Sequence, residues 1–423
     1  MKTNLLDFGS ISHIQKGKKP LRQTNVPTEG YSPYVDIEAF ETGNIKMYAN
    51  GEKCLPCKNG DILIVCDGSR SGFVGRAIDG YVGSTLAVIT ADGMLQEYLY
   101  YFLQGKYALL NTKKRGTGTP HLDTTILNQQ KLVVPSAKEQ KRIVARIEEL
   151  FSELDNGVET LKKTKQQLAV YRQSVLRAAF EGKYTEQWRK SQHKAIAARD
   201  LNDIKIHGAV FKDISGDENE MKLSLPAEWV KIRIGDVFTV EVGSTPSRRV
   251  LEYWNGDVAW VSSGEVHFNV ISETEERITK SGLEHASTKV HPIGTIMLAM
   301  IGEGKTRGQA AILNIPAAHN QNTAAILVSK TPCQPRYIYY FLQLNYENTR
   351  RVGSGNNQKA LNKERVRALR FPFASFEEQK RIVSEIESRF SVCDSIEKSV
   401  DAALQQAESM RQSILKKAFE GGL

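Results

Sequence analysis

Apolar residues recur every seven positions in two long stretches of the chain. The two rows are Ile147, Leu154, Leu161, Leu168 and Val175, and Ile386, Cys393, Val400, Ala407 and Ile414. Lys, Glu and Gln occupy the outer faces, so the pattern predicts two long helices with a coiled-coil seam. Gly157 interrupts the first helix at a cost of about 1 kcal/mol relative to Ala, which makes a bend or break possible there. Gly182 and Gly421 suit the positions that end such helices.

The two stretches are copies of each other. Residues 139–144, Glu-Gln-Lys-Arg-Ile-Val, recur 239 positions later as residues 378–383. Further matches in the same register are 98–104 with 337–343 and 179–182 with 418–421. The chain therefore consists of a variable unit followed by a helical unit, twice, and this duplication predicts a molecule with pseudo-twofold symmetry.

The repeat predicts the domain organisation. The expected parts are a first variable domain over 1–135, a first long helix over 136–182, a connector over 183–221, a second variable domain over 222–374 and a second long helix over 375–423. Antiparallel packing of the two helices is the simplest way to bury both seams within one chain, and it would place the variable domains at opposite ends. The alternative is a coiled coil between two molecules.

Each variable domain mixes strands, glycine turns and helices, so the fold class is α+β. The apolar runs 61–66 and 294–301 predict equivalent strands that lead into glycine-rich turns. The Tyr-rich segments 97–107 and 335–347 predict helices, and their aromatic rows fit core packing better than base stacking.

Composition narrows the class of protein. The chain has 423 residues and a formal net charge of +9, so it is moderately basic and too long for a single ordinary domain. No apolar stretch approaches the roughly 18 residues of a membrane span, and the start lacks a signal-peptide pattern, so we expect a cytoplasmic protein. The five cysteines are too few for a disulfide framework, and Cys54 and Cys57 lack the further ligands that a metal site needs.

Basic and polar turns fall at equivalent places in the two variable domains. Cations suit phosphates, whereas Asn, Gln, Thr and His can read base edges. The candidate DNA-binding residues are Ser69, Arg70, Lys113, Lys114, Arg115, Thr117, Thr119 and His121 in the first domain, and Thr245, Ser247, Arg248, Arg249, Lys305, Arg307, Asn356, Asn357, Gln358 and Lys359 in the second. Each residue alone is equally consistent with an ordinary solvated loop, but recurrence in both domains of a basic chain favours DNA binding.

Residues 299–306 nearly spell a phosphate-binding loop. The motif needs Gly where Ala299 stands, and it needs a following helix, whereas residues 308–313 have the pattern of a strand. A nucleotide-binding enzyme that uses Lys305 is therefore an alternative function. A coiled-coil scaffold protein without DNA specificity is another.

Several motifs in this order resemble the specificity subunit of type I restriction-modification systems. They are 182–188, Leu225-Pro-Ala-Glu-Trp229, Ile234-Gly-Asp-Val237, 253–260, and the duplicated Glu-Gln-Lys-Arg-Ile-Val and Ala-Phe-Glu-Gly segments. The resemblance covers essentially the whole chain. The first domain departs from it, because it begins at Leu5-Leu6-Asp7-Phe8 without a Leu-Pro-x-x-Trp segment, which indicates a trimmed first domain or a different subtype.

The resemblance implies two target recognition domains, each reading one half of a bipartite site in double-stranded DNA, separated by a pair of antiparallel conserved helices. It also implies a subunit that is not itself an enzyme and needs no cofactor. Two modification subunits, which methylate adenine with S-adenosylmethionine, would dock on it, and restriction subunits that use ATP and Mg²⁺ would join them. The target sequence and the spacer length stay open.

Overall fold

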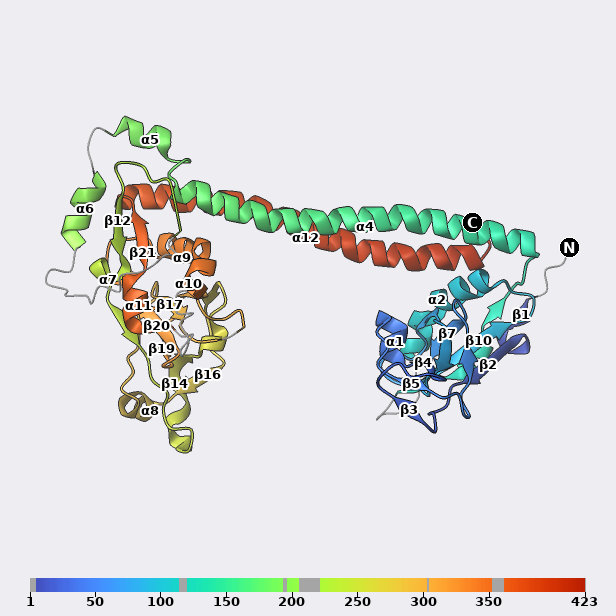
Figure 1. The fold of residues 1–423 in the computed structure, drawn as a ribbon. Helices are drawn as coiled ribbons and strands as arrows, with labels where there is room; N and C mark the ends of the chain where they lie inside the picture. The colour runs from blue at the N-terminus through green and yellow to red at the C-terminus, as the bar shows by residue number, and fades with distance from the viewer. Residues whose placement is uncertain are drawn as a thin grey trace. The chain divides into compact units, whose positions relative to one another are not determined.

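The computed structural model describes residues 5–113, 120–192, 196–204, 221–302, 304–351 and 361–422. It contains two compact units (Figure 1). The first comprises Met1–Thr164 and Ser399–Leu423, and the second comprises Lys165–Lys398. Each unit therefore contains one variable domain and one end of both long helices. In the described ranges, no helix combines the length and the apolar character that crossing a membrane requires.

The two long helices are α4 (Ala137–Phe180) and α12 (Phe376–Phe419). In the first unit the start of α4 packs against the end of α12, through Ile147 and Leu415 among others. In the second unit the end of α4 packs against the start of α12, through Val175 and Ile386 among others. The helices therefore run antiparallel in both units, which confirms the predicted arrangement (Figure 1).

The heptad rows form the buried seam of these helices. Their buried members are Ile147, Leu168, Val175, Ile386, Cys393, Val400 and Ala407. Helix α4 continues through Gly157 without a break, because neighbouring turns on both sides pack against α12. Gly182 and Gly421 have φ angles of 68° and 82°, the left-handed conformation predicted for the residues that end the helices.

The first unit contains two larger sheets and one strand pair. The sheet in the order β2-β10-β7-β8 consists of β2 (Ser12–Lys16), β10 (Leu86–Ala91), β7 (Ile62–Val65) and β8 (Val74–Arg76). The sheet in the order β3-β5-β4-β9-β6 consists of β3 (Gln23–Thr24), β5 (Tyr48–Ala49), β4 (Ser32–Val35), β9 (Gly80–Val82) and β6 (Pro56–Cys57). The paired strands are β1 (Leu6–Asp7) and β11 (Lys131–Leu132). The shorter helices are η1 (Phe8–Ser10), α1 (Ile37–Thr42), α2 (Gln96–Thr112) and α3 (Thr124–Asn128).

The second unit has corresponding sheets. The larger, in the order β13-β20-β17-β18-β15, consists of β13 (Val240–Val242), β20 (Thr323–Ile326), β17 (Ile296–Ala299), β18 (Ala310–Leu313) and β15 (Asn269–Ile271). The smaller consists of β16 (Glu276–Ile278), β14 (Trp254–Val261) and β19 (Ala318–His319). Strands β12 (Val230–Arg233) and β21 (Arg370–Phe373) pair. The shorter helices are α5 (Glu186–Ser191), α6 (Ile196–Ile204), α7 (Ile234–Val237), η2 (Leu251–Tyr253), η3 (Ser263–Glu265), α8 (Lys280–His285), η4 (Val328–Lys330), α9 (Pro335–Leu344), α10 (Tyr346–Arg351) and α11 (Lys363–Ala368).

Strand β7 in the first unit and strand β17 in the second are buried on both faces. In β7, Ile62 and Ile64 pack with Leu99 and Phe102 of α2, whereas Leu63 and Val65 belong to a second cluster that includes residues of the five-stranded sheet. The side chains of β17 alternate between two clusters in the same way. This double burial explains why both strands are continuous apolar runs, and it confirms the strands predicted at 61–66 and 294–301.

The internal repeat extends to the architecture. The order β2-β10-β7-β8 corresponds to β13-β20-β17-β18, and α2, α3 and α4 correspond to α9 with α10, α11 and α12, each beginning 239 residues later. The tyrosine rows of α2 and α9 include the buried Tyr98, Tyr337 and Tyr340, which confirms core packing. The units differ in the other sheet, which has five strands in the first unit and three in the second, and in β15, which adds a fifth strand to the β17 sheet of the second unit.

The connector is more ordered than expected. Helices α5 and α6 form within it, and Ala197 and Leu201 of α6 are buried in the core of the second unit. The interpretation of residues 183–221 as a connector outside the core was therefore wrong for this part, because amphipathic spacing in α6 lets it bury an apolar face.

Candidate nucleic-acid interface

Three segments meet at one edge of the four-stranded sheet in the first unit. They are residues 66–73, 83–85 and 120–121. The Gly68 amide donates to the Pro120 carbonyl (2.8 Å), and the Cys66 amide donates to the Thr85 carbonyl (2.8 Å). The turn predicted after β7 therefore lies beside His121, which follows the basic loop that begins at Lys113.

Asp67 organises this edge. Its carboxylate accepts from Lys16 Nζ and from His121 Nδ1, each at 2.7 Å. Burial raises the pKa of Asp67, but the hydrogen bonds from Lys16 and His121 outweigh it and hold that pKa below its usual value. With Nδ1 engaged, the Nε2 atom of His121 is the ring nitrogen left to contact a ligand.

The cationic side chains at this edge differ in whether they already contact other protein groups. Arg70 forms an ion pair with Glu41 (2.7 Å) and stacks 4.1 Å from the ring centre of Phe73, whereas Lys113 is exposed at the end of α2. Ser69 contributes its carbonyl to a hydrogen bond from Asn111 Nδ2 (2.9 Å). Lys113 is therefore the better candidate for a phosphate contact, and Arg70 for stabilising the turn.

The second unit brings equivalent loops to the same edge of its larger sheet. The loops are residues 243–249, 300–309 and 320–322. The Met300 amide donates to the Asn322 carbonyl (2.8 Å), and the Ser244 amide donates to the His319 carbonyl (3.0 Å). Residues far apart in the sequence thus form one continuous edge.

Within the 243–249 loop, the Arg248 side chain contacts other groups of the protein. Its guanidinium pairs with Glu276 (2.8 Å) and lies 3.9 Å from the ring centre of Trp254. The hydrogen bond from Arg248 lowers the pKa of Glu276. Ser247 accepts a hydrogen bond from Trp254 Nε1 through its carbonyl (3.2 Å). Arg249 is exposed, and we find no partner for it among the described residues.

The loop that carries Lys305 is a hairpin between β17 and β18, which pair antiparallel. It leads into a strand, so it lacks the helix N-terminus on which a phosphate-binding loop depends. Tyr346 donates to the Lys305 carbonyl, and Arg350 Nη2 donates to the Gly304 carbonyl (2.6 Å). Arg307 is 9% exposed, and its Nε has no hydrogen-bond partner in the described part of the chain.

Eight candidate residues lie outside the described residues. They are Lys114, Arg115, Thr117, Thr119, Asn356, Asn357, Gln358 and Lys359. The described chain on either side of 352–360 contacts the hairpin, since Arg350 bonds Gly304 and the Leu361 amide donates to the Met300 carbonyl (3.0 Å). Among the residues described, no cluster of three His, Cys, Asp or Glu side chains could hold a metal ion.

Sequence analysis missed several residues at these edges. Lys16 and Arg350 join them, as does the turn Asn320–Asn322, whose Gln321 side chain is exposed and accepts a hydrogen bond from Thr245 Oγ1. An amide-rich tripeptide directly before an apolar strand was a usable signal, because that is where a turn enters the sheet edge.

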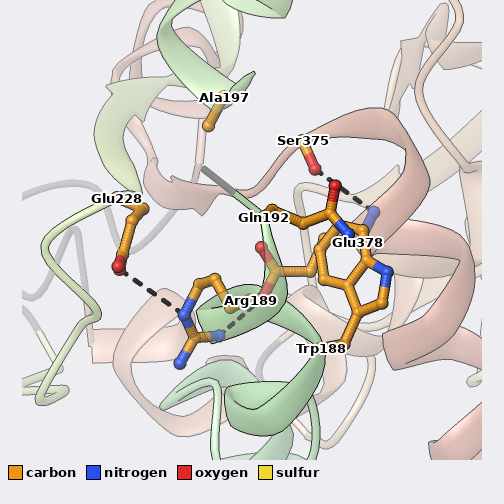
Figure 2. Close-up of a pocket in the computed structure, with 7 residues that line it drawn as sticks. All are labelled: Trp188, Arg189, Gln192, Ala197, Glu228, Ser375 and Glu378. Atoms are coloured by element: carbon orange, nitrogen blue, oxygen red, sulfur yellow. Dashed lines mark hydrogen bonds and ion pairs between the residues drawn. The ribbon is translucent and has the colours of Figure 1, made fainter. Parts of the chain in front are cut away.

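Three of the family-like motifs meet at Glu378 in the second unit. Its carboxylate accepts from Thr185 Oγ1 (2.7 Å), Arg189 Nη1 (2.6 Å) and Trp229 Nε1 (2.8 Å). Figure 2 shows Arg189 between Glu378 and Glu228 at the rim of a pocket. The buried ion pair thus fastens the end of α4 and the entry to the second domain onto the start of α12.

Among the described residues of the first unit, this junction has no counterpart. Glu139 stands at the position equivalent to Glu378, but its side chain is 43% exposed and pairs with Arg142 of its own helix (2.8 Å). The next residue is equivalent in both copies: Gln140 accepts from the Leu95 amide (2.7 Å) before α2, as Gln379 accepts from the amide before α9 (3.1 Å). The two copies therefore differ at the Glu site, whereas the adjacent Gln makes the same contact in both.

Comparison with known proteins identifies relatives along the whole chain. A family model described as type I restriction modification DNA specificity domain matches residues 4–169 and 226–406, once in each copy. The chain is 23% identical to the type I restriction enzyme MjaVIII specificity subunit of Methanocaldococcus jannaschii, over 90% of this chain and 84% of the relative. It is 25% identical to the EcoBI specificity subunit of Escherichia coli, over 92% and 80%.

Two solved structures share the fold. One, from work on complex assembly and conformational transition of the type I R-M system, has a TM-score of 0.68 at 18% identity, covering 99% of this chain and 98% of that chain. The HsdS subunit from Thermoanaerobacter tengcongensis has a TM-score of 0.52 at 18% identity, covering 99% and 97%. Since the family model spans both copies, the chain belongs to the family of type I restriction-modification DNA specificity subunits.

Proposed function

We propose that each unit reads one half of a bipartite DNA site through the edge loops of the sheet that contains β7 in the first unit and β17 in the second. The observation that carries this proposal is the repetition of the edge: the loop after β7 and the loop after β17 both meet the segments that flank a basic loop. Exposed Lys113 in one unit and Arg249 and Lys305 in the other supply cations for phosphates, and the neighbouring polar groups face bases.

Methylation, translocation and cleavage belong, in this proposal, to partner subunits. The relatives are named as specificity subunits of restriction enzymes, which supports a recognition role for this chain. S-adenosylmethionine, ATP and Mg²⁺ would be used by the modification and restriction subunits. The complex would act on double-stranded DNA in the cytoplasm.

A duplicated surface supports the docking of two modification subunits. In the first unit Tyr101 donates to Glu148 (3.4 Å) and packs edge-on against Phe151. Arg411 covers Phe151 at 4.5 Å from the ring centre and pairs with Asp155. These residues line an open groove between α2 and the helix pair.

The same group of side chains recurs in the second unit. Tyr340 donates to Glu387 (3.5 Å) and packs edge-on against Phe390, which Arg172 covers at 6.0 Å. Arg172 pairs with Asp394 at 2.5 Å. Two equivalent aromatic and charged surfaces suit two copies of one partner, because each copy can make the same contacts.

The test is sequencing of adenine methylation in the host genome with and without this gene. We expect a bipartite methylated motif that disappears on deletion and returns on complementation. A methylation pattern that is independent of the gene would contradict the proposal. Nucleotide binding by the isolated chain that Lys305→Ala abolishes would instead support the enzyme alternative, and weak binding to all DNA sequences with no methyltransferase partner would support the scaffold alternative.

A further inference from the structure

We infer that Gln321 reads an adenine in the half-site contacted by the second unit, and that Thr245 is the positioning residue that orients its amide. This inference rests on the proposed function. It adds Gln321 to the candidate specificity-determining residues, from which the sequence motifs had left it out.

The position of Gln321 places it between the other edge loops. It lies at the centre of the turn that opens β20, with its side chain exposed. On one side the Met300 amide donates to the carbonyl of Asn322 (2.8 Å), and on the other the Ser244 amide donates to the carbonyl of His319 (3.0 Å). A side chain here projects from the middle of the edge.

The turn is anchored in the protein core. His319 and Thr323 are fully buried, and His319 Nδ1 lies 2.7 Å from Thr323 Oγ1. Thr323 Oγ1 donates to the Asn320 carbonyl (3.1 Å), and the Asn322 amide donates to Asn320 Oδ1 (3.0 Å). The backbone on both sides of Gln321 is therefore fixed before any DNA binds, which reduces the entropy lost on recognition.

The amide of Gln321 is held in one orientation. Thr245 Oγ1 donates to Gln321 Oε1, which leaves a second lone pair on that oxygen and both hydrogens of Nε2 available. Adenine in the major groove presents N7 as an acceptor and N6 as a donor, and a Gln side chain pairs with both. Guanine places O6, an acceptor, where Gln321 would need a donor.

The first unit offers a matched contrast. Strand register pairs Val35 with Val82 in the first unit and Val261 with His319 in the second, so the counterpart of the 320–322 turn is Gly83-Ser84-Thr85. These short side chains cannot span an adenine edge in the same way. The inference therefore predicts that this reader acts in one half-site only.

The experiment uses the complex of the full chain with its modification subunits. The wild-type motif is first defined, and competition binding is then measured with duplexes in which each base pair of the second half-site is varied in turn. The variants are Gln321→Ala, the isosteric Gln321→Glu and Thr245→Ala. The matched control is Asn314→Ala, which removes an exposed amide that is hydrogen-bonded to Ser272 (3.3 Å) at the opposite end of β18.

We expect both Gln321 variants to reduce discrimination about 5- to 150-fold at a single A·T pair of the second half-site. Thr245→Ala should reduce it less at the same pair, and Asn314→Ala should leave every preference unchanged. Uniform loss of affinity, or unchanged discrimination, in Gln321→Glu would overturn the inference while leaving a bipartite wild-type motif intact. Absence of any sequence preference in the wild-type complex would contradict the proposed function instead.

Discussion

The Glu378 carboxylate accepts more hydrogen bonds than a residue that only starts a helix would need. Its side chain is 3% exposed, and the Arg189 side chain that pairs with it is 11% exposed. Burying two charges costs solvation, which their attraction and the added bonds from Thr185 and Trp229 offset only while all partners remain. The residue therefore stabilises a junction of three segments, and its loss should affect the second unit as a whole.

We expect Glu378→Gln to lower the free energy of unfolding of the second unit by about 3 kcal/mol, because the largely buried Arg189 would keep Glu228, at 3.5 Å, as its one carboxylate partner among the described residues. Urea denaturation of the full chain, followed by tryptophan fluorescence, measures this change. The control is Glu139→Gln at the equivalent, partly exposed position, which should leave the urea midpoint unchanged. Equal effects of the two substitutions would show that the buried junction adds nothing.

A pair of buried histidines makes the second unit sensitive to acid. His291 and His319 lie with their Nε2 atoms 3.2 Å apart. Burial lowers the pKa of His319 to about 3 and also lowers the pKa of His291. In the unfolded chain both titrate near pH 6.5, so the unfolded state binds more protons as the pH falls from about 6.5 toward 3. Stability is therefore greatest above about pH 6.5 and declines below it.

For His319 this decline should reach about 1.4 kcal/mol per pH unit, and His291 should add to it in the same direction. The measurement compares urea midpoints at pH 7.5 and 5 for the wild type and for the double variant His291→Cys, His319→Val. The replacements are the residues that the strand register places at the equivalent positions of the first unit, Cys57 and Val82. The variant should have a weaker pH dependence. A slope identical to that of the wild type would rule out the histidine pair as its source.

At the scale of elements, the sequence predicted helices and strands correctly where the hydrophobic pattern was extended and unambiguous. Heptads over 44 residues predicted α4 and α12, and continuous apolar runs predicted β7 and β17. Strands of two residues, such as β3 and β6, carry no period, and their existence depends on partners distant in the chain. The order of strands in each sheet is likewise a long-range property.

The same limit applied to the candidate interface. Equivalent turns in a duplicated chain predicted which loops share an edge, and the described loops do so. The ion pair between Arg248 and Glu276 could not be predicted from the sequence. The two residues lie 28 positions apart and are brought together by the pairing of β14 with β16. Gln321 was missed because only tertiary structure brings its turn beside Thr245.

Gly157 lies inside α4 where an added Cβ would meet nothing. We therefore expect Gly157→Ala to stabilise the first unit by about 0.5–1 kcal/mol, since it lowers the entropy of the unfolded chain without a steric cost. Thermal and urea denaturation measure the gain. The matched control is Gly105→Ala in α2, where the new Cβ would lie 3.3 Å from Leu415 Cβ and packing should cancel the benefit. Destabilisation by Gly157→Ala would indicate that the helix needs flexibility there.

At the scale of the whole molecule, duplication has kept some parts and changed others. The long helices correspond, and so do the strand orders β2-β10-β7-β8 and β13-β20-β17-β18, whereas the other sheets differ in strand number and the edge turns differ in residue type. Two domains that read different half-sites need the same framework of elements but different residues at the edges that contact DNA. The proposed function gives the helix pair a separate role, for which we expect it to set the accepted spacing between the two half-sites.

That task predicts how the accepted spacer should respond to helix length. Residues 155–170 of α4 contain the boundary between the two units, and the ion pairs Arg411–Asp155 and Arg172–Asp394 bracket the partner segment of α12. Inserting one heptad into both segments keeps the seam in register and adds roughly 10 Å, about three base pairs of DNA. The methylated motif should keep both half-sites and lengthen its spacer by about that amount.

Sequencing of adenine methylation in cells that carry the lengthened chain measures the spacer directly. An insertion in α4 alone is the control for mere disruption, because it puts the heptad seam out of register with α12 and should abolish methylation rather than change its pattern. Full methylation at the original spacer by the doubly extended chain would refute the ruler role of the helices, since the two reading edges would then be positioned by other contacts.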